Sequence, residues 1–240
     1  MLFLLRQIRR KLMTENKFTT YLLYAIGEII LVVVGILIAV QINQAITLKE
    51  KSKRKMDYIH SMIEEIQSDT AAIKRIIGYS QSELDKLDTL KSALAEMSIQ
   101  LKDLPNIRLT PNLGTLTNFN NTSFVVMLNT GDLELFTREV RSALVKFNAL
   151  QEKYIKLNDL NTDVFYGTLN RHVVNAGFGS TLPDKLYNEY VDESYYKKYA
   201  ATMNALTIQK RYLLGLYMIR YQELMDESVK MLNLLESLKE

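Results

Sequence analysis

The strongest pattern in the chain is one nearly unbroken apolar run. Tyr21 to Ile42 is 22 residues long and contains a single charged residue, Glu28. As an α-helix this run would be roughly 33 Å long, enough to cross a hydrocarbon core of about 30 Å. It is longer than the apolar part of a signal peptide, and residues 39–41 make a poor cleavage site. The pattern therefore predicts an uncleaved transmembrane helix within residues 19–43.

After the apolar run, three long stretches follow helical periodicity. In each of them apolar residues recur three, four or seven positions apart, which is typical of a helix with one buried face. The stretches cover residues 56–97, 133–168 and 192–238. Two segments rich in proline, glycine and asparagine, 101–121 and 175–184, are expected to be loops.

A short helix is expected between the first loop and the second long stretch. Thr122 or Ser123 would cap its start, and Gly131 would follow its last residue. Asp132 would then cap the next helix, and Asp192 stands where the final one begins.

Together these elements predict an all-α protein. It would have an N-terminal interfacial helix in residues 1–18, one transmembrane helix in 19–43, and an elongated antiparallel bundle of three long helices in 44–240. Nothing around residues 44–55 stops a helix, so the transmembrane helix is expected to be able to continue into the bundle. The alternative is a bundle folded into a four-helix or shorter form by kinks near three glycines: Gly78, Gly167 and Gly215.

Positive charge flanks the apolar run, although the net charge of the chain is only +3. Residues 1–20 carry +4 and residues 44–60 carry +3, which leaves −3 for residues 61–240 once Glu28 is counted. Such flanks suit anionic lipid headgroups, whereas a nucleic-acid partner would call for a basic face on the folded body. The residues predicted to contact lipid headgroups are Arg6, Arg9, Arg10, Lys11, Lys51, Lys53, Arg54 and Lys55.

The basic leader has two interpretations. Its apolar residues fall at helical spacing opposite its basic ones, as in a helix lying at the membrane surface, but an ordinary positive flank of a signal anchor would look the same. Five basic residues lie on each side of the run, so the positive-inside rule is balanced. The position of the leader favours a cytoplasmic N-terminus and a periplasmic body.

Glu28 is costly to place near the middle of a bilayer, by a few kcal/mol when ionised. Its helical neighbours at spacings of three and four are small or apolar, a composition that lets membrane helices approach closely. The predicted packing face consists of Ala25, Glu28, Val32, Gly35 and Ala39. Glu28 would be protonated and hydrogen-bonded across a helix pair, or would act as a proton or ion group, or would pair with a basic residue. Each interpretation requires a partner helix, from another membrane protein or from another copy of the chain.

Two segments resemble a known family. YLLYAIGEIILVVVGILIAVQIN in the apolar run and NTSFVVMLNTGDLELFTREVRSALVKF at residues 121–147 resemble the signatures of an uncharacterised family of small membrane proteins from Bacteroidetes-type bacteria. The chain departs from that family after residue 43, where relatives often carry a tryptophan. The resemblance implies a bacterial inner-membrane protein with a helical body, and it implies no activity.

Candidate catalytic chemistry is sparse. The chain has no cysteine, which excludes disulfides, thiolate nucleophiles and cysteine metal sites. His60 with Glu64 and Glu65 has metal-ligand spacing on one helix, but a solvated helix face is the favoured interpretation. The tyrosine-rich residues 187–199 are expected to pack within or on the bundle, with headgroup contact as the alternative. No catalytic residue, metal or cofactor is expected.

These observations favour a non-enzymatic accessory or scaffold subunit of a bacterial inner-membrane complex. The packing face around Glu28 would dock in the membrane, and the helical body would contact a soluble partner or another copy. The alternative is an extracytoplasmic, sensor-like helical domain that binds a small ligand and acts through a partner. A scaffold predicts a filled core with an exposed apolar patch, whereas a sensor predicts a pocket of convergent polar groups.

Overall fold

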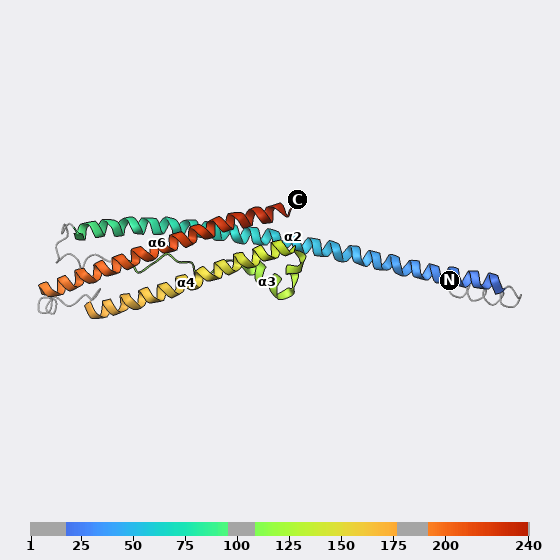
Figure 1. The fold of residues 1–240 in the computed structure, drawn as a ribbon, viewed down its shortest axis with the longest axis horizontal. Coiled ribbons are helices and arrows are strands. Elements are labelled where there is room, and N and C mark those ends of the chain that lie inside the picture. The colour runs from blue at the N-terminus through green and yellow to red at the C-terminus, as the bar shows by residue number, and fades with distance from the viewer. Residues whose placement is uncertain (1–17, 96–108, 177–191, 240) are drawn as a thin grey trace. The chain divides into compact units, whose positions relative to one another are not determined.

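The computed structural model describes residues 18–95, 109–176 and 192–239. These residues hold helices and no strand, so the predicted all-α class is confirmed (Figure 1). The predicted interfacial helix falls on residues that are not described, apart from its last one. The elements are α2 (Phe18–Ala95), α3 (Thr122–Thr130), the 3₁₀ helix η2 (Asp132–Leu135), α4 (Arg138–Ala176) and α6 (Glu193–Ser237).

The chain divides into two compact units, Met1–Lys55 and Met56–Glu240. α2 runs without interruption from Phe18 to Ala95, so it continues from the apolar run through residues 44–55, as the sequence allowed. No proline or glycine interrupts residues 36–77, which is the local reason for this continuity.

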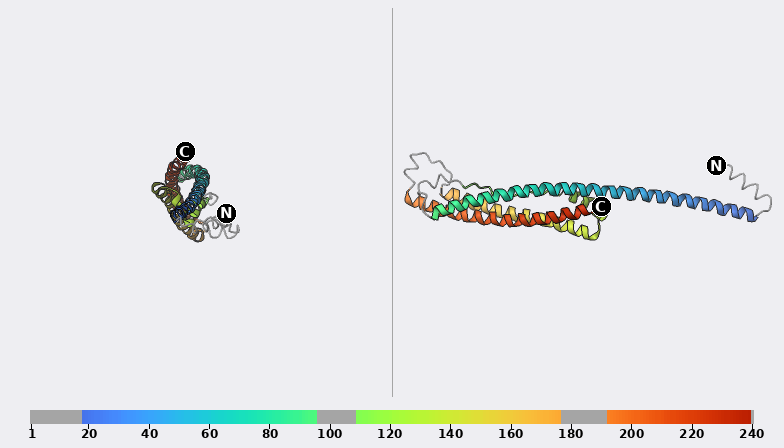
Figure 2. Two further views of the ribbon diagram at one scale, coloured as in Figure 1. Left: turned by 90° about the vertical axis from the view of Figure 1, so that its right-hand side faces the viewer. Right: turned by 90° about the horizontal axis from the view of Figure 1, so that it is seen from above.

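In the second unit, α2 from Met56 onward lies beside α4 and α6 (Figures 1 and 2). The helices bury their apolar stripes against one another, forming two clusters. In the first cluster Ile59 and Met62 of α2 pack with Leu144 of α4 and Leu235 of α6. In the second cluster Ile73 of α2 packs with Phe165, Tyr217 and Tyr221 among others. α6 therefore runs antiparallel to both of the other helices, which share one direction.

Residues 109–121, which we call the strap, explain why α2 and α4 run in the same direction. The strap passes back along α2: Thr110 contacts Glu83, and Asn120 contacts Asp69, fourteen residues earlier in α2. It also buries Leu113 and Phe119 in the bundle. The expected loop between two antiparallel helices is therefore, in its described part, a returning segment that belongs to the core.

The end of α3 and the start of α6 agree with the predicted signals, whereas Asp132 does not cap the next helix: it is the first residue of η2, and α4 begins at Arg138. α3 ends at Thr130 before Gly131, which has a positive φ of 76°, and the Asp192 side chain accepts a hydrogen bond from the Tyr195 N–H at 2.8 Å. The start of α3 differs, because its N-cap is Asn121 instead of Thr122 or Ser123. Glu65 of α2 accepts hydrogen bonds from the backbone and side chain of Ser123, so a tertiary partner does the capping. α2, α4 and α6 also pass uninterrupted through the three glycines proposed as kinks.

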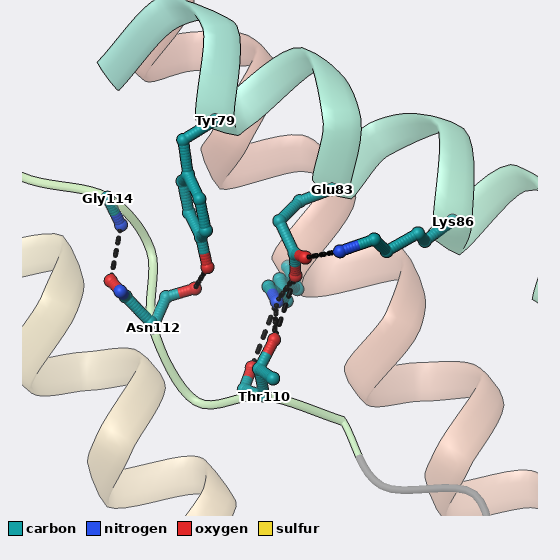
Figure 3. A network of polar contacts seen from close by, with 7 residues as sticks. Tyr79, Glu83, Lys86, Thr110, Asn112 and Gly114 are labelled. Carbon is teal, nitrogen blue, oxygen red and sulfur yellow. Dashed lines mark hydrogen bonds and ion pairs between the residues drawn. The ribbon is translucent and has the colours of Figure 1, made fainter. Parts of the chain in front are cut away.

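Gly114 in the strap should be harder to replace than Gly131, although both have positive φ, 61° and 76°. A Cβ at position 114 would lie 2.6 Å from Cδ1 of Tyr79, whereas nothing lies within 4 Å of a Cβ at position 131. The Tyr79 hydroxyl donates to the Asn112 carbonyl at 3.2 Å, which holds the ring in place (Figure 3). Gly131→Ala should cost about 1–2 kcal/mol for the left-handed backbone, and Gly114→Ala about 1–3 kcal/mol more for the crowding. Chemical denaturation of both variants tests this, and equal losses would contradict it.

Candidate functional site

The predicted packing face lies on α2 in the first unit. Four of its five residues are exposed and Ala25 is half-buried. A Cβ built on Gly35 meets no atom within 4 Å, so no described part of the chain covers the middle of this face. By its length and composition α2 could cross a membrane near its N-terminal end, and none of the most apolar part of the helix is buried in the structure.

The predicted headgroup residues divide into two groups. Arg6, Arg9, Arg10 and Lys11 lie outside the described residues. The second group follows the apolar run on α2, where Lys51, Lys53 and Arg54 are exposed and Lys55 is half-buried.

The most heavily buried charge in the described chain was not predicted. Lys210 of α6 is 0% exposed, and its ammonium nitrogen lies 2.6 Å from Oε2 of Glu83 on α2. It also donates to the carbonyl and hydroxyl oxygens of Thr110 in the strap, both at 2.9 Å. Three acceptors match the three hydrogens of an ammonium group. Lys210 is thus a fully satisfied clasp that joins α2, α6 and the strap.

Glu83 completes this clasp with two more donors (Figure 3). Its carboxylate accepts from the Thr110 hydroxyl at 2.8 Å and from the exposed Lys86 at 2.9 Å. Burial by itself would raise the pKa of Glu83, but hydrogen bonds from Lys210, Lys86 and Thr110 outweigh that effect and lower the pKa to about 2. The carboxylate is therefore charged throughout the physiological range. The Lys210–Glu83 ion pair is buried, and all three ammonium hydrogens of Lys210 are hydrogen-bonded. The pair therefore has a structural role and offers no reactive group to a substrate.

A second set of contacts holds the other end of the strap. Asp69 accepts hydrogen bonds from the backbone and side chain of Asn120 at 2.8–3.1 Å. Burial raises the pKa of Asp69 to about 6; the hydrogen bonds from Asn120 oppose this rise and the nearby Glu65 carboxylate adds to it. Asp69 and Glu65 thus fix the strap and the start of α3 to one face of α2.

Tyrosine hydroxyls provide further polar contacts in the core. The Tyr221 hydroxyl accepts from the Leu116 N–H at 2.9 Å and from the Asn158 amide at 3.2 Å. The Tyr217 hydroxyl donates to the Asn158 carbonyl at 3.0 Å. Buried polar groups are costly unless they find such partners. These bonds join the strap, α4 and α6 into one packed unit.

His60, Glu64 and Glu65, which have metal-ligand spacing in the sequence, do not come together as a metal site. His60 and Glu64 are exposed on α2, whereas Glu65 is half-buried and binds Ser123, so the solvated interpretation was wrong for that residue. Across the described residues there is no group of three or more His, Cys, Asp or Glu side chains placed to hold a metal ion. From the tyrosine-rich segment, Tyr199 is buried against Met203, while residues 187–191 are outside the described residues.

Sequence reasoning missed the clasp, although one signal was present. Lys210 lies between Leu206 and Leu213 at spacings of four and three, which puts a lysine on the apolar stripe of α6. A lysine at such a position requires a buried anion, because an isolated charge in the core would be very costly. Periodicity alone does not say which carboxylate supplies it.

No protein-family model, curated protein or solved structure matches the chain. The geometry of the described residues therefore carries the functional argument.

Proposed function

We propose that this protein is a non-enzymatic accessory or scaffold subunit of a bacterial inner-membrane complex. It docks in the membrane through the face that contains Ala25, Glu28, Gly35 and Ala39. The observation that carries the proposal is a lone carboxylate on a helix face of small residues, with no described part of the chain covering that face. Polar and small residues on one face of a membrane helix are best satisfied by a second helix.

The second unit supports this proposal through the way it uses its polar groups. Lys210, Glu83 and Asp69, the most strongly buried charged groups, all hold the strap in place. The cavity beside Glu65 and Phe147 has a volume of about 20 Å³, room for roughly one water molecule. That part of the core is therefore filled, as the scaffold proposal predicts.

The body of the protein, residues 44–240, is placed in the periplasm in this proposal. Its support is the short basic leader before the span, since the basic residues on the two sides balance. Labelling of a Thr117→Cys variant by an impermeant maleimide in intact cells checks the placement, and labelling only after lysis would overturn it. Membership of the Bacteroidetes-type membrane family belongs to the same proposal and rests on the residues of the span.

The docking face is tested by extraction in a mild detergent, sizing, and mass spectrometry of the proteins that co-purify. We expect a defined membrane partner with the native chain, and loss of that partner in Glu28→Gln and in Gly35→Leu. The first change removes the carboxyl group, and the second fills the gap that allows close helix approach.

Gly27→Leu is the matched control, because it makes the same change on the same helix about 100° away from Glu28. Nothing lies within 4 Å of a Cβ at either glycine, so neither change disturbs the chain itself. Equal partner loss in Gly27→Leu and Gly35→Leu would contradict docking through this face. If the native chain extracted in detergent has the size of a monomer without a partner, the proposal is wrong.

A further inference from the structure

The outer face of α6 carries a stripe of exposed residues, of which Glu223 also accepts a hydrogen bond from the Tyr154 hydroxyl of α4. Ile208 is 52% exposed, and Tyr212 and Ile219 are each 68% exposed, which is unusual for large apolar side chains on a packed helix. The α6 stripe continues into acidic residues at its C-terminal end. It comprises Ile208, Tyr212, Gly215, Ile219, Glu223 and Asp226.

α4 carries a second outward stripe with the opposite charge at one end. Leu160 and Val164 are 61% and 56% exposed, and the two residues before them in the stripe are exposed lysines. The α4 stripe comprises Lys153, Lys156, Leu160, Val164, Gly167 and Arg171.

The two stripes lie at the same level of the bundle. Within the chain the hydrogen bonds between α4 and α6 join residues whose numbers add up to 375–379, so residues whose numbers add up to 379 lie within about one helical turn of a common level. Every residue of the α6 stripe has a counterpart in the α4 stripe by this rule. Apart from Glu223, which accepts a hydrogen bond from the Tyr154 hydroxyl of α4, the stripes face away from the α4–α6 contact, so their other residues can meet only a stripe from another molecule.

The chemistry of these level pairs is complementary. Asp226 is level with Lys153 and Glu223 is level with Lys156, which places opposite charges together. Ile219 is level with Leu160, and both are apolar. At two further positions a large side chain meets a glycine: Val164 is level with Gly215, and Tyr212 is level with Gly167. Ile208 is level with Arg171, whose aliphatic stem can lie against an apolar side chain. A Cβ built on either glycine meets no atom within 4 Å, so space for the opposing side chain is open.

We propose that the α6 stripe of one molecule packs antiparallel against the α4 stripe of a second copy standing beside it. The interface is heterologous, because it joins two different stripes. In a pair of copies, one copy still has a free α4 stripe and the other a free α6 stripe, so further copies can bind in the same way. The common level follows from the proposed function, because identical chains anchored in one membrane hold their second units at the same distance from it. Membrane anchoring also raises the effective concentration of one copy for another.

The same charges argue against pairing α6 with another α6 in a parallel arrangement. Asp226 would then face its own counterpart, as would Glu223. A groove of about 590 Å³ borders the α6 stripe on the side of α2, where Leu84 and Lys91 form the other wall. The α4 stripe of a neighbouring copy would fill this groove with apolar side chains and leave Lys91 at the rim of the groove.

Single cysteines test the arrangement in the full-length, membrane-bound chain, which has no cysteine of its own. Two differently tagged chains, one with Leu160→Cys and the other with Ile219→Cys, are produced together and oxidised. We expect a disulfide-linked band that contains both tags. In the control the second chain carries Ile208→Cys instead; this site lies roughly 16 Å along the helix, too far for a disulfide, so the band should be lost.

Charge exchange tests the ends of the stripes. Lys153→Glu in the first chain should weaken the linked band, and Asp226→Lys in the second should restore it. Absence of the 160–219 link would overturn the proposal. A Tyr212→Cys chain that links to itself would overturn it too, because two α6 helices would then be paired. These substitutions lie outside the membrane face, so failure here and loss of the co-purifying partner through Glu28 are separate results.

Discussion

Replacing Lys210 with methionine should lower the free energy of unfolding by about 3 kcal/mol. Methionine has a similar volume and fills the site, so the main loss is the charge. Glu83 would remain 5% exposed with its buried cation gone, and the Thr110 carbonyl would lose its donor. Glu83 would keep only the Thr110 hydroxyl and the exposed Lys86 as donors, and a buried anion that has lost its buried cation is far more costly than a pair of neutral residues. Denaturant titration of the detergent-solubilised chain by circular dichroism measures the difference.

Lys86→Met provides the matched control for this prediction. Lys86 contacts the same carboxylate at 2.9 Å, but its side chain is 70% exposed, so solvent screens the interaction. Its replacement should change the free energy of unfolding much less. The double variant Glu83→Met, Lys210→Met should recover part of the loss, since it removes both buried charges. Equal effects of the two lysine replacements would contradict the clasp.

Stability should also pass through a maximum at mildly acidic pH, because Asp69 and Glu83 depart from ordinary carboxyl pKa values in opposite directions. The pKa of Asp69 is raised from 3.8 to about 6 in the fold, so its protonated form favours folding. That contribution is fully present below pH 3.8 and is lost as pH rises through 6. Acidification from pH 7 to pH 4 should therefore stabilise the protein, by on the order of 2 kcal/mol from this residue.

Glu83 produces the acid limb of the same profile. Its pKa is lowered from 4.5 to about 2, so its contribution is present above pH 4.5 and is lost as pH falls through 2. The loss should also be on the order of 2 kcal/mol. Thermal melts across this range test both limbs. Asp69→Asn should flatten only the upper limb, and Glu83→Gln only the lower one; an upper limb that survives in Asp69→Asn would contradict the assignment.

Much of the helical structure could be predicted from local signals. The continuity of α2 follows from a long interval without proline or glycine, and the end of α3 follows from Gly131. The start of α6 next to Asp192 follows from the apolar stripe that begins there. The face around Glu28 could be found because helical spacing alone places its residues together.

The strap and the clasp could not be predicted in this way. Residues 109–121 have the composition of a loop, and composition does not reveal that Leu113 is buried or that Thr110 binds Lys210. Glu83 sits between residues of ordinary helical pattern, and its partner is 127 positions away. The return of the strap along α2 also decided that α2 and α4 run in the same direction, which a count of helices and loops does not specify.

Sequence by itself determined the helix-forming segments, the apolar run that can span a bilayer, and the one charged residue within it. These are local properties, set by residue type and by a spacing of three or four positions. Tertiary structure decided the direction of the helices, the partners of the buried charges, and which stripes remain outside the core. Those features depend on contacts between residues far apart in the chain, and periodicity records that a side chain is buried or exposed without recording what it meets.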